Sequence, residues 1–152
     1  MSGYRSRNAA TAIVTELIVE TFRLNGRLLE AGDELVRPLG LTSARWQVLG
    51  AIAASSVPLP IAHIARNMGL SRQAVQRLAN EMEKQGLVRF APNPHHERAK
   101  FVVMTAPGRA AFRSAMTRQR RWAQSLAEGL SNDSVKEALH MLRELRNKLE
   151  GT

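Results

Sequence analysis

The 152-residue sequence contains no cysteine, few aromatic residues (5%) and no long apolar run. The absence of cysteine excludes disulfides, thiolate nucleophiles and cysteine-ligated metal sites. Residues 1–12 are polar and lack the apolar core of a signal peptide. No stretch approaches the roughly 18–20 apolar residues of a membrane-spanning helix. These absences favour a soluble, cytoplasmic protein that does not span a membrane.

The sequence signatures of the common enzyme classes are missing as well. The chain has no G-x-S-x-G motif, no phosphate-binding G-x-x-x-x-G-K-[ST] loop and no G-x-G-x-x-G turn. Its four histidines form none of the spaced pairs that bind zinc, and no cysteine completes a ligand set. The sequence therefore predicts no enzyme, no catalytic residue, no cofactor and no metal site.

Positive charge is in excess and is unevenly distributed. The 22 lysines and arginines outnumber the 13 acidic residues, which gives a net charge of +9. Residues 60–105 carry +4 and residues 106–127 carry +5, whereas both ends of the chain are close to neutral. Because a solubility device would not need such placement, the distribution favours a polyanionic partner, either nucleic acid or an anionic membrane surface.

The N-terminal region is predicted to form a long helix over residues 9–37, with Asn8 as the N-cap and Pro38 and Gly40 at its end. The helix carries two apolar stripes, so we expect one side to pack on its own domain and the other on a partner. The stripes comprise Ile13, Leu17, Leu24, Leu28 and Leu35, and Val14, Ile18, Phe22, Leu29 and Val36.

The C-terminal region repeats this pattern. Gly129 ends the preceding helix, and Ser131 caps a final helix that runs to about residue 150. Its apolar residues recur at steps of three and four, which is the spacing of a helix–helix seam. The seam comprises Val135, Ala138, Leu142, Leu145 and Leu149.

Between these regions the sequence predicts four further helices and a β-hairpin. The helices cover residues 43–54, 61–68, 71–85 and 105–128, and the strands cover residues 87–90 and 101–104. Residues 55–60 are expected to form a connection without regular structure. Thr42 caps the first of these helices, whose inner face comprises Trp46, Leu49, Ile52 and Ala53. Thr105 caps the last, whose apolar side comprises Phe112, Ala115, Trp122 and Leu126. The predicted fold class is mainly α with a small β-hairpin (α+β).

The helices over residues 61–68 and 71–85 have the spacing of a helix-turn-helix, because only Gly69 and Leu70 separate the first helix from the Ser71 cap of the second. In the second helix Val75, Leu78, Ala79 and Met82 are predicted to face inward. The opposite face is rich in arginine and amide side chains, which are uncommon on an ordinary solvated helix face. It comprises Arg72, Gln73, Gln76, Arg77 and Asn80.

These residue types suit the major groove of DNA. Arginine forms paired hydrogen bonds with guanine, and glutamine or asparagine does so with adenine. We therefore predict base contacts from Gln73, Gln76 and Arg77. Ser71 and Arg72, at the helix N-terminus, are predicted to contact phosphates. The alternative is a polar helix face that binds no ligand.

The predicted hairpin has a long polar tip that contains His95, His96, Arg98 and Lys100. A basic tip beside a recognition helix can reach the adjacent minor groove, where the negative potential favours arginine. We assign that contact to Arg98. A helix-turn-helix followed by such a hairpin constitutes a winged helix.

Three segments together resemble the MarR family of bacterial transcription regulators. They are LSRQAVQRLANEMEKQGLV, the wing end RAKFVVMT, and the start of the next helix at Thr105–Gly108. The resemblance covers roughly residues 10–150. It implies a homodimer, joined through its terminal helices, that reads a pseudo-palindrome with two winged helices. It also implies one MarR-like domain over residues 1–152, with DNA binding in residues 42–105 and dimerisation in residues 9–37 and 106–150.

One position departs from the family pattern. The resemblance places an aspartate two residues before the wing arginine, where this chain has His96. An aspartate would orient the arginine, whereas a charged histidine cannot, so we expect the strength of the wing contact to vary with pH.

The resemblance also implies a small aromatic or anionic effector that releases DNA. Trp46 and Trp122 are candidates for lining an effector cleft, with packing in the core as the plainer alternative. The basic cluster of Arg118, Arg120 and Arg121 either contacts phosphates or an acidic effector, or is simply a solvated helix face. No ligand-binding residue is assigned.

The sequence as a whole favours a sequence-specific, dimeric DNA-binding regulator with no membrane partner. Within the family such proteins are most often repressors. Its half-sites are expected about 10–10.5 base pairs apart. Two alternatives stay open at this stage: a basic helical protein that binds any polyanion, and a small-molecule carrier whose helix-turn-helix is vestigial.

Overall fold

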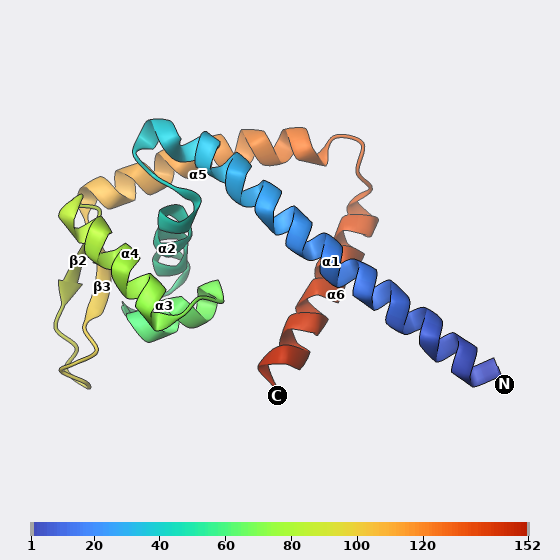
Figure 1. The fold of residues 1–152 in the computed structure, drawn as a ribbon. Coiled ribbons are helices and arrows are strands. Elements are labelled where there is room, and N and C mark those ends of the chain that lie inside the picture. The colour runs from blue at the N-terminus through green and yellow to red at the C-terminus, as the bar shows by residue number, and fades with distance from the viewer. Residues whose placement is uncertain (1, 152) are drawn as a thin grey trace. The chain divides into compact units, whose positions relative to one another are not determined.

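The computed structural model describes residues 2–151, with side chains from Asn8 onward (Figure 1). The chain divides into two compact units, Met1–Met116 and Thr117–Thr152, which are described separately below. The predicted fold class is confirmed, because the described residues are mainly helical and include one small sheet. In chain order the elements are α1 (Ser2–Val36), η1 (Arg37–Leu39), α2 (Ser43–Ala54), β1 (Leu59–Pro60), α3 (Ile61–Met68), α4 (Arg72–Lys84), β2 (Val88–Ala91), β3 (Phe101–Met104), α5 (Ala106–Ala127) and α6 (Asn132–Glu150).

Helix α1 is longer than its apolar pattern predicts, and little of its surface is covered. It begins at Ser2, so the prediction of Asn8 as its N-cap is wrong. Figure 1 shows α1 extending as a long rod from the winged part of the first unit. The prediction that one stripe packs on its own domain holds only for the last turns, where Val36 is buried and Leu35 packs against the core. The other large apolar residues along most of its length are exposed, and Phe22 is 73% exposed.

Two hydrogen bonds connect the end of α1 to the start of α2. The Asp33 carboxylate accepts a hydrogen bond of 2.6 Å from the backbone N–H of Ser43, and the Ser43 hydroxyl donates to the carbonyl of Leu29 over 2.8 Å. Gly32 lies directly against the Ser43 hydroxyl and leaves no room for a Cβ atom. The predicted cap is confirmed, because the Thr42 hydroxyl accepts from the N–H of Arg45.

The core of the first unit lies where α2, α3, α4 and the sheet meet. Its fully buried large side chains are Val36, Val48, Leu49, Ile64, Val75, Met82, Val88 and Val102. The predicted inner face of α2 is partly wrong. Val48 is fully buried, whereas Ala53 is exposed because it lies in the last turn of the helix. Trp46 is half-buried and packs against this core.

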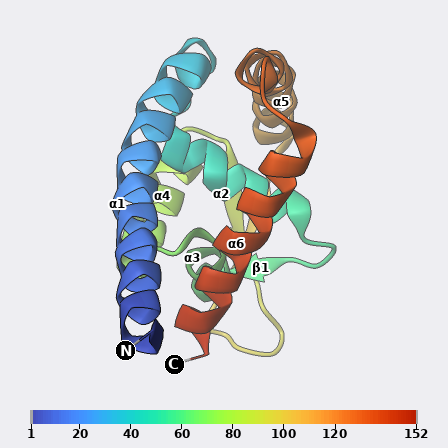
Figure 2. The ribbon, with the colours of Figure 1, turned by 90° about the vertical axis from the view of Figure 1, so that its right-hand side faces the viewer.

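The sheet contains one strand more than the predicted hairpin. Its order is β1–β3–β2, and both pairings are antiparallel. The hairpin pairs Val88 with Met104, and on the other edge β1 pairs Leu59 with Val102. The prediction that residues 55–60 lack regular structure is therefore wrong. Strand β1 has only two residues, so its pairing across the chain, rather than any local pattern, reveals it (Figure 2).

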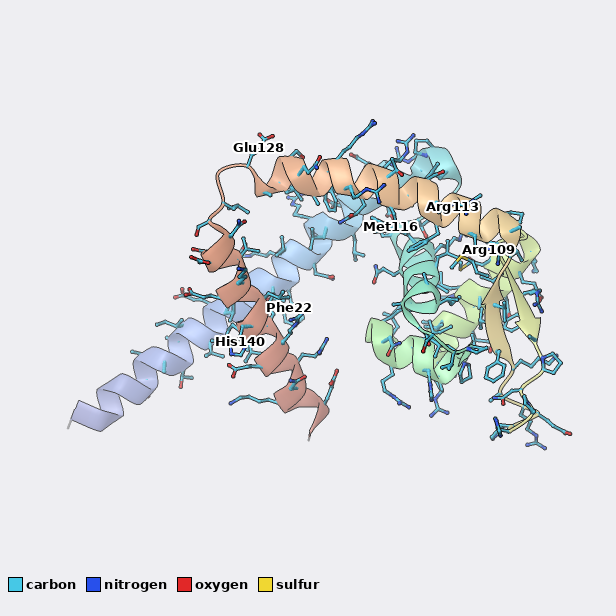
Figure 3. The ribbon with its side chains drawn as sticks, turned by 180° about the vertical axis from the view of Figure 1, so that it is seen from behind. Phe22, Arg109, Arg113, Met116, Glu128 and His140 are labelled. Atoms are coloured by element: carbon cyan, nitrogen blue, oxygen red, sulfur yellow. The ribbon has the colours of Figure 1, made fainter. Side chains whose placement is uncertain are left out.

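Helix α5 starts in close contact with the end of the helix-turn-helix. The predicted cap is confirmed, because the Thr105 hydroxyl accepts from the N–H of Gly108 over 3.1 Å. Gly108 is buried against the backbone carbonyl of Leu87, and a Cβ atom there would overlap that carbonyl. The Arg109 guanidinium donates to the carbonyl of Met104 over 2.9 Å (Figure 3). Ala115 is buried in the core as predicted.

The second unit contains the end of α5 and helix α6. Trp122 is half-buried, whereas Leu126, which was predicted on the same apolar side, is 51% exposed. Gly129, with φ of 77°, follows Glu128 and ends the turn after α5, and the Ser131 hydroxyl caps α6 as predicted (Figure 3). Among the seam residues of α6 only Leu145 is half-buried, and the others are exposed in the single chain.

No helix among residues 2–151 is long and apolar enough to cross a membrane.

Candidate nucleic-acid interface

The helix-turn-helix forms at the predicted residues. Helix α3 ends at Gly69, which has a φ of 65° and therefore needs a residue without a Cβ atom. The N–H of Leu70 returns to the carbonyl of Ala65 over 3.0 Å, and this bond closes the turn. The Ser71 hydroxyl accepts from the N–H of Ala74 over 3.1 Å and caps α4. These local bonds set where α4 begins.

Helix α4 presents the predicted polar face to solvent. Val75, Ala79 and Met82 are fully buried, which places the opposite side of the helix outward. All five residues of the predicted DNA-contacting face are exposed: Arg72, Gln73, Gln76, Arg77 and Asn80. The predicted burial pattern of this helix is confirmed.

Two of these exposed residues are joined. The Gln76 side-chain Nε2 donates to Oδ1 of Asn80 over 2.9 Å. The bond leaves the side-chain oxygen of Gln76 and the amide N–H groups of Asn80 without a partner in this pair. The two amides therefore present one hydrogen-bonding surface rather than two independent ones. The sequence placed both amide side chains on the predicted DNA-contacting face, but only the structure shows the hydrogen bond between them.

The recognition helix and the wing line one open groove of about 970 Å³. Helix α4 and strand β2 lie side by side (Figure 1). From the predicted site residues the groove brings together Arg72, Gln73, Gln76, Arg77, Asn80, Arg98 and Lys100. Ser71 and His96 do not line it, and both are exposed. Five basic side chains line the groove against two acidic ones, so its charge suits a polyanion.

The two acidic residues of the groove hold α4 in place. Glu81 forms an ion pair of 3.1 Å with Arg45 of α2. Glu83 accepts from the backbone N–H of Phe90 on β2 over 3.4 Å. The Arg45 side chain is only 21% exposed, and its Nε atom is buried without a partner in the described residues. Sequence reasoning missed Arg45, because nothing in the local pattern connects it to a residue 36 positions away.

The tip of the wing is organised by a residue that sequence reasoning also missed. The Asn93 side chain is half-buried, accepts from the N–H of His95 over 3.0 Å and donates to the carbonyl of Ala99 over 2.9 Å. Its backbone carbonyl accepts from the N–H of His96 over 3.2 Å. The sequence did contain a signal for this turn. An asparagine between two prolines is typical of a turn in which the asparagine side chain hydrogen-bonds the nearby backbone.

The remaining histidine and arginine candidates from the sequence do not line this groove. His63 is exposed on α3, and Arg118, Arg120 and Arg121 are exposed on α5 in the second unit. Among the residues that the structure describes, no three acidic or histidine side chains come close enough to hold a metal ion.

The fold and the groove define a winged helix-turn-helix of the kind that binds DNA. Comparison with known proteins supports this class. A model of the MarR family matches residues 39–99, which span the helix-turn-helix and most of the wing.

Two curated relatives extend the similarity. An uncharacterised protein of Mycobacterium tuberculosis is 33% identical over 105 residues, which cover 69% of this chain and 72% of that protein. The transcriptional activatory protein BadR of Rhodopseudomonas palustris is 28% identical over 149 residues, which cover 94% of this chain and 85% of that protein.

Solved structures agree in fold. The M. tuberculosis regulator MosR, solved in complex with DNA, is 26% identical with a TM-score of 0.72 over 87% of this chain and 96% of that one. CouR from Rhodococcus jostii, solved with p-coumaroyl-CoA, is 25% identical with a TM-score of 0.73 over 81% and 86%. The chain belongs to the MarR family and is a DNA-binding transcriptional regulator.

Proposed function

We propose that the protein acts as a homodimer that binds a pseudo-palindromic operator, with α4 of each protomer in the major groove and the wing in the adjacent minor groove. The single observation that carries this proposal is the shared groove, in which the arginine and amide face of α4 meets Arg98 and Lys100 of the wing. A polyanion binder without sequence preference needs only positive charge. The three amides on this face argue for base reading as well.

Each side chain has a role in this proposal. Gln73, Gln76 and Arg77 contact base edges, and Asn80 acts with Gln76 through their hydrogen bond. At the helix N-terminus, Ser71 and Arg72 contact phosphates, where the free backbone N–H groups also favour an anion. On the wing, Arg98 enters the minor groove, while His96 and Lys100 contact the backbone beside it.

The proposed dimer covers the apolar surface that the single chain leaves open. On α1 the exposed side chains include Ile13, Phe22 and Leu24, and on α6 they include Val135 and Leu142. A row of exposed apolar side chains along a helix marks an interaction site. We therefore assign dimerisation to residues 9–37 and 106–150 and DNA binding to residues 42–105.

Repression is the proposed sign of regulation, through an operator that overlaps the promoter and blocks the polymerase. BadR, which is described as an activatory protein, is the reason to test the opposite sign. A reporter gene under the protein's own promoter distinguishes the two: deletion of the regulator raises expression for a repressor and lowers it for an activator.

We also propose that a small aromatic or anionic effector releases the DNA. The support is the structure of CouR with p-coumaroyl-CoA, an aromatic acyl thioester that carries phosphates. A panel of aromatic acids and their coenzyme A thioesters, added to the protein–DNA complex, tests this proposal. A compound that lowers DNA affinity supports it, and a panel with no effect at saturating concentration contradicts it for this class.

The main experiment tests whether the protein prefers one DNA sequence over others. The full-length protein is used to enrich duplexes from a randomised pool, and the affinity for the enriched duplex is compared with that for a scrambled one at two salt concentrations. We expect one enriched pseudo-palindrome and preferential binding that survives excess competitor. Equal affinity for both duplexes with a steep salt dependence would instead describe a general polyanion binder. Absence of binding would favour the carrier alternative.

A further inference from the structure

The wing tip contains a bonded loop that surrounds the position of Arg98. Residues 92–100 connect β2 to β3 and include one proline on each side of Asn93. Most of these side chains are exposed, but Asn93 is half-buried. Ala99 is half-buried as well, so two side chains of the tip are covered, and the hydrogen bonds of Asn93 account for this.

Three bonds of Asn93 supply that reason. Its side-chain oxygen accepts from the N–H of His95, its side-chain nitrogen donates to the carbonyl of Ala99, and its backbone carbonyl accepts from the N–H of His96. The N–H of Ala99 in turn donates to the carbonyl of His96 over 3.0 Å. These bonds restrain the backbone on both sides of Arg98, because His96 precedes it and Ala99 follows it directly.

The side chain of His96 takes no part in this network. It is exposed, and in the described part of the chain it makes no hydrogen bond or ion pair, so only its backbone contributes. The residue at the position expected to orient the wing arginine therefore makes no hydrogen bond or ion pair with Arg98. Asn93, three positions earlier, instead bonds the backbone on both sides of Arg98, at His95, His96 and Ala99.

Arg98 gains from such restraint because it is long, exposed and flexible. Ordering a rotamer-rich side chain and its loop on binding costs free energy, and a loop ordered in advance lowers that cost. Arg98, Ala99 and Lys100 all line the groove shared with α4, so the restrained loop forms the wing side of that groove.

We propose that Asn93 is the positioning residue of the wing arginine and that His96 has no part in orienting it. The inference rests on the proposed function of Arg98 as the minor-groove contact. Loss of the Asn93 amide then weakens DNA binding mainly through Arg98, because Asn93 itself acts on the loop and not on DNA.

A double-mutant cycle tests this coupling on the full-length protein and the duplex that it enriches from a randomised pool. We expect Arg98→Ala to weaken binding about 5- to 150-fold, as for loss of a specific arginine contact. Asn93→Ala should weaken binding about 3- to 30-fold, and the double variant should bind within about threefold of Arg98→Ala alone. Combined with Arg77→Ala on α4, the Asn93→Ala effect should multiply instead.

The matched control is His96→Ala, which removes a neighbouring side chain of the same tip and should not disturb the orientation of Arg98. A modest loss, which should multiply with that of Arg98→Ala, would mark a separate phosphate contact of His96. Thermal unfolding of Asn93→Ala should stay within about 4 °C of the unmodified protein, since the tip lies outside the core. An Asn93→Ala variant that binds like the unmodified protein, or whose loss multiplies with that of Arg98→Ala, would overturn the proposal.

A second readout does not depend on DNA. The amide hydrogen exchange of Ala99 should become at least about tenfold faster in Asn93→Ala and stay unchanged in His96→Ala. If the unmodified protein enriches no duplex, the proposed function fails, and this measurement still decides whether Asn93 orders the loop. Unchanged exchange at Ala99 would overturn the positioning role by itself.

Discussion

The winged part and the terminal helices differ in how far their apolar side chains are buried within the single chain. In the winged part, residues from α2, α3, α4 and the sheet close around one another, and Val48, Ile64, Val75 and Val102 have no exposed surface. Along α1 and α6 most apolar side chains are exposed. A closed core needs no partner, whereas an open apolar stripe needs one, so the two regions depend on different equilibria: folding in one case and association in the other.

The polar face of α4 is a second open surface, of opposite chemistry. It is exposed like the stripes of α1, but its side chains carry charge and amide groups. Association through apolar stripes should depend weakly on salt, whereas binding through Arg72, Arg77 and Arg98 should weaken steeply as salt rises. One salt titration that follows both oligomeric state and DNA affinity separates the two surfaces.

The largest expected effect comes from placing a charge in an apolar stripe. Phe22→Glu puts a carboxylate at a side chain that is 73% exposed in the single chain and buried in the proposed dimer. An unpaired charge in an apolar interface costs several kcal/mol. We expect a monomer by sedimentation analysis and at least a roughly 100-fold loss of DNA affinity.

The control for this variant is Arg23→Glu, which changes the charge at the neighbouring, equally exposed position. It should leave the protein dimeric. A Phe22→Glu protein that sediments like the unmodified one would show that this stripe is not the dimer interface.

Alanine substitutions at two glycines test the same contrast through the free energy of unfolding. Gly108→Ala forces a Cβ atom into the backbone carbonyl of Leu87, whereas Gly26→Ala on α1 meets no atom within 4 Å. We expect Gly108→Ala to lower the free energy of unfolding by about 2–3 kcal/mol, from overpacking that outweighs the gain in helix propensity. Gly26→Ala should raise it by about 0.5–1 kcal/mol.

Urea unfolding of the two glycine variants at one protein concentration provides the measurement. Equal effects at the two positions would contradict the contrast between a closed and an open region. A destabilised Gly26→Ala protein that also dissociates would instead show that the dimer brings another helix close to Gly26.

Base reading by α4 predicts an effect of intermediate size. Arg77→Ala should cost about 1–3 kcal/mol of binding free energy on the enriched duplex and relax the preference at one base pair. Asn80→Ala should relax a second position, the one read by Gln76, because it removes the bond that orients that amide. Competition with single-base variants of the duplex measures both. Uniform weakening across all variants would assign these residues to the phosphates instead.

The smallest expected effect concerns the anchor of the recognition helix. Arg45→Met keeps much of the apolar stem but removes the ion pair with Glu81, which is partly exposed. Partly exposed pairs contribute little, so we expect a loss of only about 1 kcal/mol in the free energy of unfolding. DNA affinity should fall by about two- to fivefold, because α4 loses one of its supports. Affinity equal to that of the unmodified protein would show that packing of Val75 and Met82 suffices to hold α4.

The helix-turn-helix could be predicted almost residue by residue. Thr42, Ser71 and Ser131 cap helices, and Gly69 and Gly129 end turns, because each needs only a hydrogen bond or a backbone conformation within a few residues. The inward face of α4 followed from the same local periodicity.

Most of the predictions that were wrong depended on distant partners. Strand β1 is two residues long and exists through its pairing with Val102 and Phe101. The inner face of α2 depends on which neighbours it meets, which is why Val48 is buried and Ala53 is not. The N-cap at Asn8 failed because the apolar stripe begins later than the helix does.

The sequence by itself determined the types of element, their caps and turns, the polar face of α4 and the basic wing, since these depend on residues a few positions apart. Only the tertiary structure showed that α4 and the wing line one groove, that Arg45 forms an ion pair with Glu81 of α4, and that the side chain of Asn93, and not that of His96, bonds the loop around Arg98. The reason is physical. Local signals arise from backbone hydrogen bonds and side-chain periodicity, whereas burial and side-chain partners depend on which distant segments the folded chain brings together.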